Sequence, residues 1–184
     1  MKINENFAGL PENYLFSETA RKKREFLKRE PGAEIIDLGI GDVRLPLGKT
    51  VVAAMKRAAA EEEHIKTFRG YPPTAGYPFL RKAVSALYQK NGISVSEDEI
   101  FISDGAKSNI VDFIGLFSAS RVLISDPSYP AYAEITVLSG KTPVYIKGTA
   151  ENGFLPLPDE NTGENLIIIL CSPGNPTGET YSKE

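Results

Sequence analysis

The residues best suited to chemistry lie in the segment Ser172–Gly178, which reads Ser-Pro-Gly-Asn-Pro-Thr-Gly. Its prolines and glycines predict an irregular loop of fixed shape, with the amide of Asn175 near its centre. The loop follows the apolar run Leu166–Leu170, which predicts a strand buried on both faces of a parallel sheet. Ligands bind at the carboxyl ends of such strands, so we expect this loop to lie at a ligand-binding edge. A plain sharp turn is the alternative.

A second segment has the composition of an anion site. Residues 103–108 read Ser-Asp-Gly-Ala-Lys-Ser and open a helix predicted over residues 105–118. The backbone N–H groups at a helix start attract phosphate, and Gly105 permits a close approach to them. The alternative is an ordinary Ser or Asp cap of the helix.

A third segment places an aromatic ring between two prolines. Residues 126–132 read Asp-Pro-Ser-Tyr-Pro-Ala-Tyr and follow a strand predicted over residues 121–125. The flanking prolines make the turn rigid, so Tyr129 is expected to form a flat platform at the same edge of the sheet. A proline turn with a core tyrosine is the alternative.

The elements that must position these loops alternate between strands and helices. This rhythm predicts an α/β fold with a three-layer, doubly wound, mostly parallel sheet and right-handed crossovers. The predicted strands are 100–102, 121–125, 143–146 and 166–170, and the predicted helices between them are 105–118 and 130–138.

The first part of the chain has a different organisation. Residues 1–16 predict an irregular apolar arm, and Ser17 is expected to cap a helix that runs to about Arg29. Further elements are predicted as a strand at 35–38 and helices at 49–64 and 77–90. We therefore predict a division near residue 98. Residues 1–98 form the arm and part of a small lobe, and residues 99–184 form the first part of a large domain.

Composition narrows the function classes. The net charge of −3, with a pI near 5.4, does not favour a nucleic-acid partner. The single cysteine, Cys171, excludes an internal disulfide and fits a reducing compartment. Neither a signal peptide nor a membrane-spanning stretch is recognisable, which predicts a cytoplasmic protein without a membrane partner. His64 is the only histidine, so no metal site is predicted.

Together, the phosphate-type helix start, the Tyr129 platform and the Ser-Pro-Gly-Asn-Pro-Thr-Gly loop resemble the fold-type I aminotransferases, which use pyridoxal 5′-phosphate. The resemblance implies that the backbone of Ala106 and Lys107 holds the cofactor phosphate. It also implies that Tyr129 stacks on the pyridine ring and that Asn175 donates to the phenolic O3′. In that family the Asn-Pro bond, here Asn175–Pro176, is typically cis.

A closer resemblance connects the chain to the LL-diaminopimelate aminotransferases. It rests on Tyr14-Leu15-Phe16, on Leu38-Gly39-Ile40-Gly41-Asp42 and on the segments at 103–107 and 126–132. It implies a homodimer, with Ile40 and Gly41 at the substrate and Tyr14 and Tyr71 reaching it across the dimer interface. The family's Gly-Tyr-Gly-x-Glu-Gln-Gly loop is Gly-Tyr-Pro-Pro-Thr-Ala-Gly here, with Thr74 in place of a Glu that helps to recognise the substrate's distal end. A related amino-acid substrate is therefore an alternative.

The family's catalytic residues have no match in the sequence. These are the Schiff-base lysine, the aspartate at the pyridine nitrogen and the arginine for the substrate carboxylate, so the catalytic residue stays unknown. We expect the chain to be an amino-terminal fragment that is inactive alone. Its parent enzyme would move an amino group between an amino acid, for example LL-2,6-diaminopimelate, and a 2-oxo acid.

Three alternatives to an aminotransferase stay open. They are a related β-lyase, a non-catalytic binding or regulatory module with the same fold, and a generic nucleotide-binding domain. The last is disfavoured because no Walker motif is present and no third glycine follows Gly39 and Gly41 at the Rossmann spacing.

Overall fold

The computed structural model describes residues 1–12, 14–39, 41, 43, 45–159 and 165–182. The chain forms two compact units: unit 1 comprises residues 1–12 and 103–184, and unit 2 comprises residues 13–102. The chain therefore passes from unit 1 to unit 2 and back again. The second passage lies close to the predicted division at residue 98, whereas the first twelve residues belong with unit 1.

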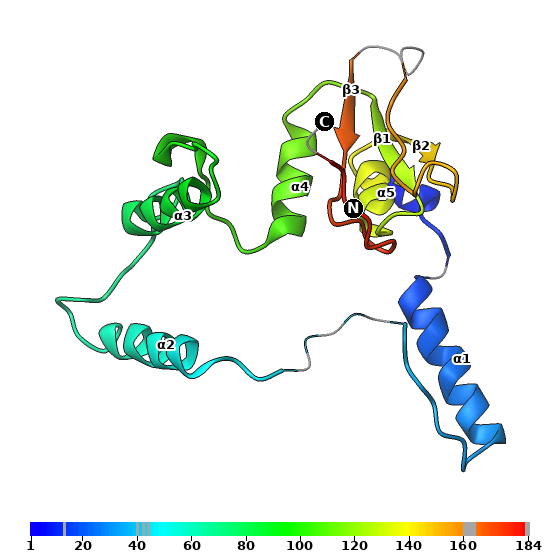
Figure 1. The fold of residues 1–184 in the computed structure, drawn as a ribbon, viewed down its shortest axis with the longest axis horizontal. Helices are drawn as coiled ribbons and strands as arrows, with labels where there is room; N and C mark the ends of the chain where they lie inside the picture. Colours follow the sequence, from blue (N-terminus) through cyan, green and yellow to red (C-terminus); the bar gives the residue numbers. More distant parts are fainter. Residues whose placement is uncertain (13, 40, 42, 44, 160–164, 183–184) are drawn as a thin grey trace. The chain divides into compact units, whose positions relative to one another are not determined.

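Unit 1 is built on a parallel sheet (Figure 1). Its strands are β1 (Arg121–Asp126), β2 (Thr142–Lys147) and β3 (Leu166–Ile169), in the order β2-β1-β3. In the register of the sheet, Leu123 of β1 lies opposite Val144 of β2 and Ile168 of β3. The predicted α/β class with a parallel sheet is confirmed.

The core of unit 1 lies around the central strand. Val122 and Ile124 are 0% exposed and Leu123 is 1% exposed. Helices α4 (Ala106–Gly115) and α5 (Ala131–Leu138) share one apolar cluster. Its members are Ile114, Ala131 and Ile135, with Ile110, Tyr129, Ile167 and Ile169 packed against it.

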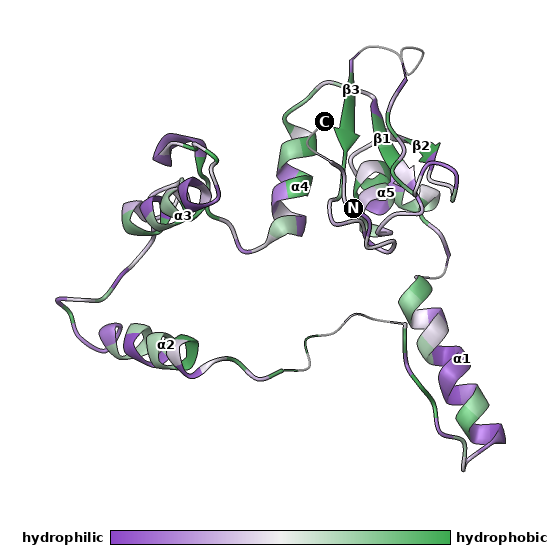
Figure 2. Cartoon of the chain, viewed as in Figure 1, coloured by the Kyte–Doolittle hydropathy of each residue, from purple (hydrophilic) through white to green (hydrophobic). Residues whose placement is uncertain are grey.

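The prediction that β3 is buried on both faces is wrong for this chain. Figure 2 shows β3 in the hydrophobic colour, and Ile167 and Ile169 do pack against the core. Ile168 points to the opposite face, because side chains alternate along a strand, and it is 45% exposed. An apolar run by itself does not reveal whether a second layer covers that face.

The N-terminal arm is docked on α5. Residues Glu5–Gly9 form a short 3-10 helix, η1, which contacts α5. The side-chain amides of Asn4 and Asn6 both donate to the carbonyl oxygen of Leu138, at 3.3 and 3.4 Å. These bonds satisfy an acceptor at the C-terminal end of α5, where helix carbonyls lack intrahelical partners.

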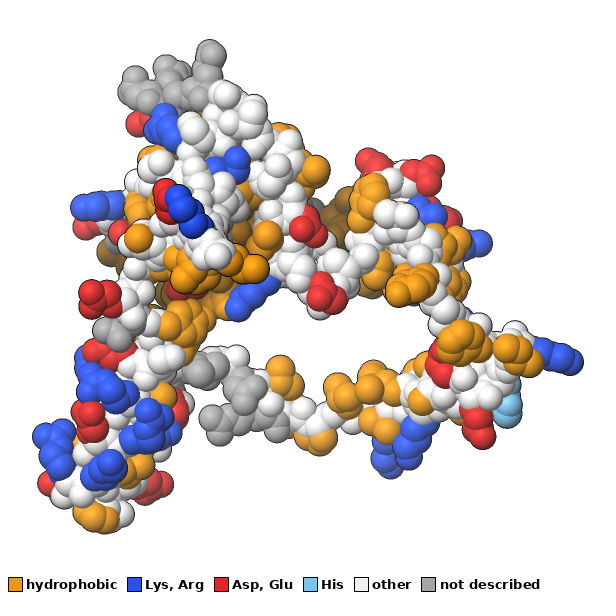
Figure 3. All heavy atoms as spheres, turned by 180° about the vertical axis from the view of Figure 1, so that it is seen from behind, with side chains coloured by type: hydrophobic (Ala, Val, Ile, Leu, Met, Phe, Trp, Pro, Cys, Tyr) orange, Lys and Arg blue, Asp and Glu red, His pale blue; other side chains and the backbone are white. Residues whose placement is uncertain are grey.

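Unit 2 begins with α1 (Leu15–Arg29), and the predicted cap at Ser17 is wrong. The N-cap is Tyr14, whose carbonyl accepts the N–H of Glu18 at 3.1 Å, so Ser17 lies inside the first turn. Figure 3 shows acidic and basic side chains interspersed over α1. Glu18 pairs with Lys22 at 3.1 Å and Arg21 with Glu25 at 2.8 Å, as expected for a solvent-exposed helix face.

Two predicted strands are absent from the described part of the chain. Residues 35–38 are extended but pair with no described strand; they run along α1, where Asp37 accepts from Lys23 at 2.8 Å. Residues 100–102 are also extended, and Ile102 donates a single backbone bond to Ala75. A strand needs a ladder partner, and apolar composition cannot supply one.

The remaining elements of unit 2 are α2 (Lys49–Glu61), α3 (Pro78–Lys90) and the 3-10 turn η2 (Glu97–Glu99). Gly76, which lies just before α3, packs closely against Ile102. It has a φ of +94°, and a Cβ added there would lie 2.5 Å from Cγ1 of Ile102. Glycine is required at this position for both reasons.

Replacement of Ile114 by Ala should destabilise unit 1 by about 2–5 kcal/mol, because it leaves a cavity in the shared cluster of α4 and α5. The matched control is Val111→Ala on the same helix. Val111 is 45% exposed, so its replacement should change stability by less than about 0.5 kcal/mol. Urea denaturation followed by circular dichroism measures both effects. Equal effects of the two substitutions would contradict the assigned core.

Candidate functional site

The strand order of unit 1 creates a defined place for a ligand. After β1 the chain builds β2 on one side of it, and β3 then joins on the other side. The order of the strands thus reverses at β1. In open α/β sheets the crevice at the carboxyl ends of the strands at such a switch point is the usual ligand site. The Tyr129 turn follows β1 and the Asn175 loop follows β3, so both lie at this edge.

The start of α4 offers backbone donors to an anion. Ala106 and Lys107 are its first residues and Gly105 is its N-cap, with a φ of +155°. The N–H of Gly105 donates to Oγ of Ser103 at 3.3 Å. The first N–H groups of a helix find no acceptor within the helix itself, so a helix start can bind an anion. A Cβ added at Gly105 would meet no atom within 4 Å, so the space beside this residue is open.

Tyr129 lies beside this helix start. Its half-buried ring packs against the shared cluster of α4 and α5. The ammonium of Lys107 lies over the ring, with Nζ 5.2 Å from the centroid. The structure therefore brings together two of the residues predicted to bind a cofactor, an anion-type helix start and an aromatic platform.

The Asn175 loop is held by its own backbone. Gly178 donates to the carbonyl of Gly174, and Gly174 donates to that of Glu179, both at 2.7 Å. Asn175 is exposed at the turn between them, and the Asn175–Pro176 bond is cis. The amide thus stands at the carboxyl side of β3 on a closed loop. This is the third element of the predicted site on the same sheet edge.

The predicted substrate residues belong to the other unit. Tyr14 is 39% exposed and contacts Phe16 edge-on, with ring centroids 5.3 Å apart. A Cβ added at Gly41 would meet no atom of the described residues within 4 Å, and Tyr71 is fully exposed. Ile40 lies outside the described residues. These three described residues are in unit 2, whereas Ala106, Lys107, Tyr129 and Asn175 are in unit 1.

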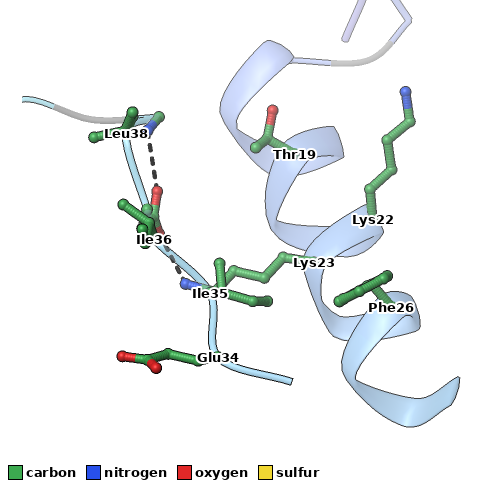
Figure 4. A pocket seen from close by; sticks show the side chains of 10 residues that line it. Thr19, Lys22, Lys23, Phe26, Glu34, Ile35, Ile36 and Leu38 are labelled. Atoms are coloured by element: carbon green, nitrogen blue, oxygen red, sulfur yellow. Dashed lines mark hydrogen bonds and ion pairs between the residues drawn. The ribbon is translucent and has the colours of Figure 1, made fainter. Parts of the chain in front are cut away.

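Unit 2 contains a groove of its own (Figure 4). It lies between α1 and the extended residues 34–39, and its lining includes Lys22, Lys23, Phe26 and Ile35. Among the residues that the structure describes, none of those predicted to bind cofactor or substrate lines this groove. Across the described residues there is no group of three His, Cys, Asp or Glu side chains able to hold a metal ion. Within the same ranges, no helix has both the length and the apolarity needed to cross a membrane.

Two contacts at the site were not foreseen from the sequence. One is the placement of the Lys107 side chain over Tyr129. The other is the contact between the Tyr132 hydroxyl and the Cys171 thiol, which connects the turn after β1 with the end of β3. The first had a signal in the sequence, because Lys107, Ile110 and Ile114 have the spacing of one helix face. The second depends on strand order, which the sequence does not state.

Comparison with known proteins gives one consistent family. The protein-family model described as aminotransferase class I and II matches residues 33–184 of the chain. The chain is 44% identical to LL-diaminopimelate aminotransferase of Agathobacter rectalis, over 100% of the chain and 48% of that protein. It is 42% identical to the enzyme of the same name from Methanosphaera stadtmanae, over 100% of the chain and 47% of that protein.

A solved structure agrees with these relatives. LL-diaminopimelate aminotransferase from Chlamydomonas reinhardtii is similar with a TM-score of 0.79 and 35% identity, over 96% of this chain and 46% of that one. The chain thus spans about half the length of the curated relatives it matches.

The pH dependence of one site residue follows from its burial. Burial, and then the contact with the Cys171 thiol, raises the pKa of Tyr132 to about 12, above the value near 10 of an unfolded tyrosine. The folded chain therefore keeps this proton at a pH where the unfolded chain loses it. The stability supplied by the neutral phenol is fully present below about pH 10 and is lost as the pH rises towards about 12.

Ultraviolet titration of phenolate absorbance follows the ionisation of all eight tyrosines. It should show a last phase at high pH, in which Tyr132 loses its proton after the exposed tyrosines have lost theirs. Tyr132→Phe should remove the last phase, and Tyr88→Phe, at a 44% exposed tyrosine, should leave it in place. An unchanged late phase in the Tyr132 variant would contradict the assignment.

Proposed function

This chain belongs to the class I and II aminotransferase family, and from that premise we propose that the protein it comes from transfers an amino group between an amino acid and a 2-oxo acid. Enzymes of this family depend on pyridoxal 5′-phosphate. The observation that carries the proposal is that the α4 start lies beside Tyr129, whose turn follows β1, while the Asn175 loop follows the neighbouring parallel strand β3. Unit 1 is then the first part of the cofactor-binding domain, and unit 2 contributes to the small lobe.

The residues of unit 1 fit this cofactor. The backbone N–H groups of Ala106 and Lys107 at the start of α4 suit a phosphate dianion, which the positive end of the helix dipole also attracts. The ring of Tyr129 suits stacking on a heteroaromatic ring, and the amide of Asn175 suits a phenolic oxygen. When bound, pyridoxal phosphate supplies the electron sink that stabilises negative charge on the amino acid's α-carbon. The chain's own residues bind it and fix its orientation.

The substrate is proposed from the relatives and from unit 2. We propose LL-2,6-diaminopimelate as the first candidate donor, with Tyr14, Ile40, Gly41 and Tyr71 as substrate residues. The loop that carries Tyr71 is closed by the Tyr77 hydroxyl, which donates to the carbonyl of Gly70 at 3.0 Å. Thr74 in this loop supports a second candidate, a related amino acid without a distal ammonium, because a hydroxyl cannot replace a carboxylate in a charge-assisted bond.

We also propose that the protein is a cytoplasmic homodimer. Support comes from large apolar side chains that unit 2 exposes, among them Phe68 at 58% and Tyr71 at 103%. Such surfaces are typical of protein contacts. The single cysteine is consistent with a reducing compartment.

Cofactor binding can be tested on this chain with pyridoxamine 5′-phosphate, which has no aldehyde and so cannot form imines with surface lysines. We expect saturable binding in equilibrium dialysis. Tyr129→Leu should weaken it roughly 3- to 10-fold through loss of ring stacking. The control Tyr145→Leu, at a 52% exposed tyrosine on β2, should bind like the unmodified chain. Absence of binding by the unmodified chain would overturn the cofactor site.

The donor can be tested in the full natural gene product. Thr74→Glu should raise kcat/KM for LL-2,6-diaminopimelate about 10-fold or more relative to a neutral amino acid, through a charge-assisted bond to the distal ammonium. Thr74→Gln introduces a side chain of the same size as Glu but without the charge, so it should not raise this kcat/KM ratio. Equal effects of Glu and Gln would argue against distal ammonium recognition at this position. A lack of transamination with every amino acid tested would overturn the proposed activity.

A further inference from the structure

One contact at the proposed site has no assigned purpose. The ammonium of Lys107 lies over the ring of Tyr129, 5.2 Å from its centroid, within the roughly 6 Å range of a cation–π interaction. The lysine is exposed and the tyrosine is half-buried. The role carried by the family resemblance concerns the backbone of Lys107, whereas this contact belongs to its side chain.

The contact is built into α4 by its periodicity. Lys107, Ile110 and Ile114 follow one another at intervals of three and four residues, which places them on one face of the helix. Ile114 is 1% exposed in the cluster against which both Ile110 and Tyr129 pack. Packing of α4 therefore directs the Lys107 side chain to the Tyr129 ring.

Tyr129 is held from α5 as well. The ring of Tyr132 meets it edge-on, with centroids 5.7 Å apart and an interplanar angle of 83°. The backbone N–H of Tyr132 donates to the carbonyl of Tyr129 at 3.1 Å. The orientation of the Tyr129 ring is thus restrained from α5 through Tyr132 and from α4 through Lys107.

We propose that Lys107 and Tyr129 act as one unit, in which Lys107 is a positioning residue that holds the Tyr129 ring in the orientation needed for a flat heteroaromatic ligand to stack on it. This inference rests on the proposed function, since it concerns the same cofactor site. The ammonium acts through the electron-rich ring face. Its effect on ligand binding is therefore conditional on the presence of that ring.

A purely electrostatic role of Lys107 makes a different prediction. A positive charge that only attracts the ligand's phosphate would weaken binding by the same factor whether or not Tyr129 is present. A double-mutant cycle separates the two, because it isolates the coupling between a pair of residues.

The experiment measures pyridoxamine 5′-phosphate binding to the 184-residue chain and to Lys107→Met, Tyr129→Leu and the double variant. We expect Lys107→Met to weaken binding about 2- to 5-fold when Tyr129 is present, the range of an exposed cation–π contact, and by a clearly smaller factor in the Tyr129→Leu background. Lys107→Arg keeps a cation and should retain binding. Lys147→Met, on the exposed end of β2, makes the same charge change elsewhere and should have no effect.

A measurement without ligand distinguishes a failure of this inference from a failure of the proposed function. In NMR spectra of the chain labelled on tyrosine rings, Lys107→Met should shift the Tyr129 resonances, and Lys107→Arg should leave them near their original positions. If the unmodified chain binds no pyridoxamine 5′-phosphate, the proposed function fails and the ring resonances still test the pair. Equal factors in the two backgrounds, or Tyr129 resonances that do not respond to Lys107→Met, would overturn the inference.

Discussion

The structure of unit 1 depends on the parallel pairing of β1 with a strand on each side. Val122, Leu123 and Ile124 are buried because β2 and β3 cover both edges of β1 while packed side chains cover its faces. Parallel strands all end at the same edge of a sheet, so this pairing gathers the segments that follow β1 and β3. The sheet thus brings the Tyr129 turn and the Asn175 loop to one edge, and the start of α4 lies beside Tyr129.

Helix α4 connects the core of this unit to its proposed site. Ile114 is anchored in the cluster with Ala131 and Ile135, while Ala106 and Lys107 begin the same helix about two turns earlier. A rigid helix transmits the position of its buried residue to its first turn, at 1.5 Å of rise per residue. Packing energy and site geometry therefore share the same residues, and a change in the cluster is felt at the backbone donors and at Tyr129.

Unit 2 follows a different rule, because its extended segments have no strand partners among the described residues. Some of their polar groups have partners within unit 2 itself. Asp37 accepts from Lys23 and from the N–H of Gly39, and Ile102 donates to Ala75. Charged side chains cover α1, and large apolar side chains such as Tyr71 stay exposed. Such a surface suits a region whose contacts are completed by other protein, which agrees with the proposed homodimer.

The sequence by itself determined the elements whose signals are local. The strands at 121–126 and 142–147, the helices of unit 1 and the three loops were all predictable, because proline, glycine and apolar periodicity act over a few residues. The tertiary structure alone decided the rest. Among the described residues it left 35–38 and 100–102 without ladder partners, and it exposed Ile168 on one face of β3. It also set the strand order that brings Tyr132 to Cys171 and, through the packing of α4, Lys107 to Tyr129. These features depend on which segments meet across long stretches of chain, and no local pattern specifies that partner.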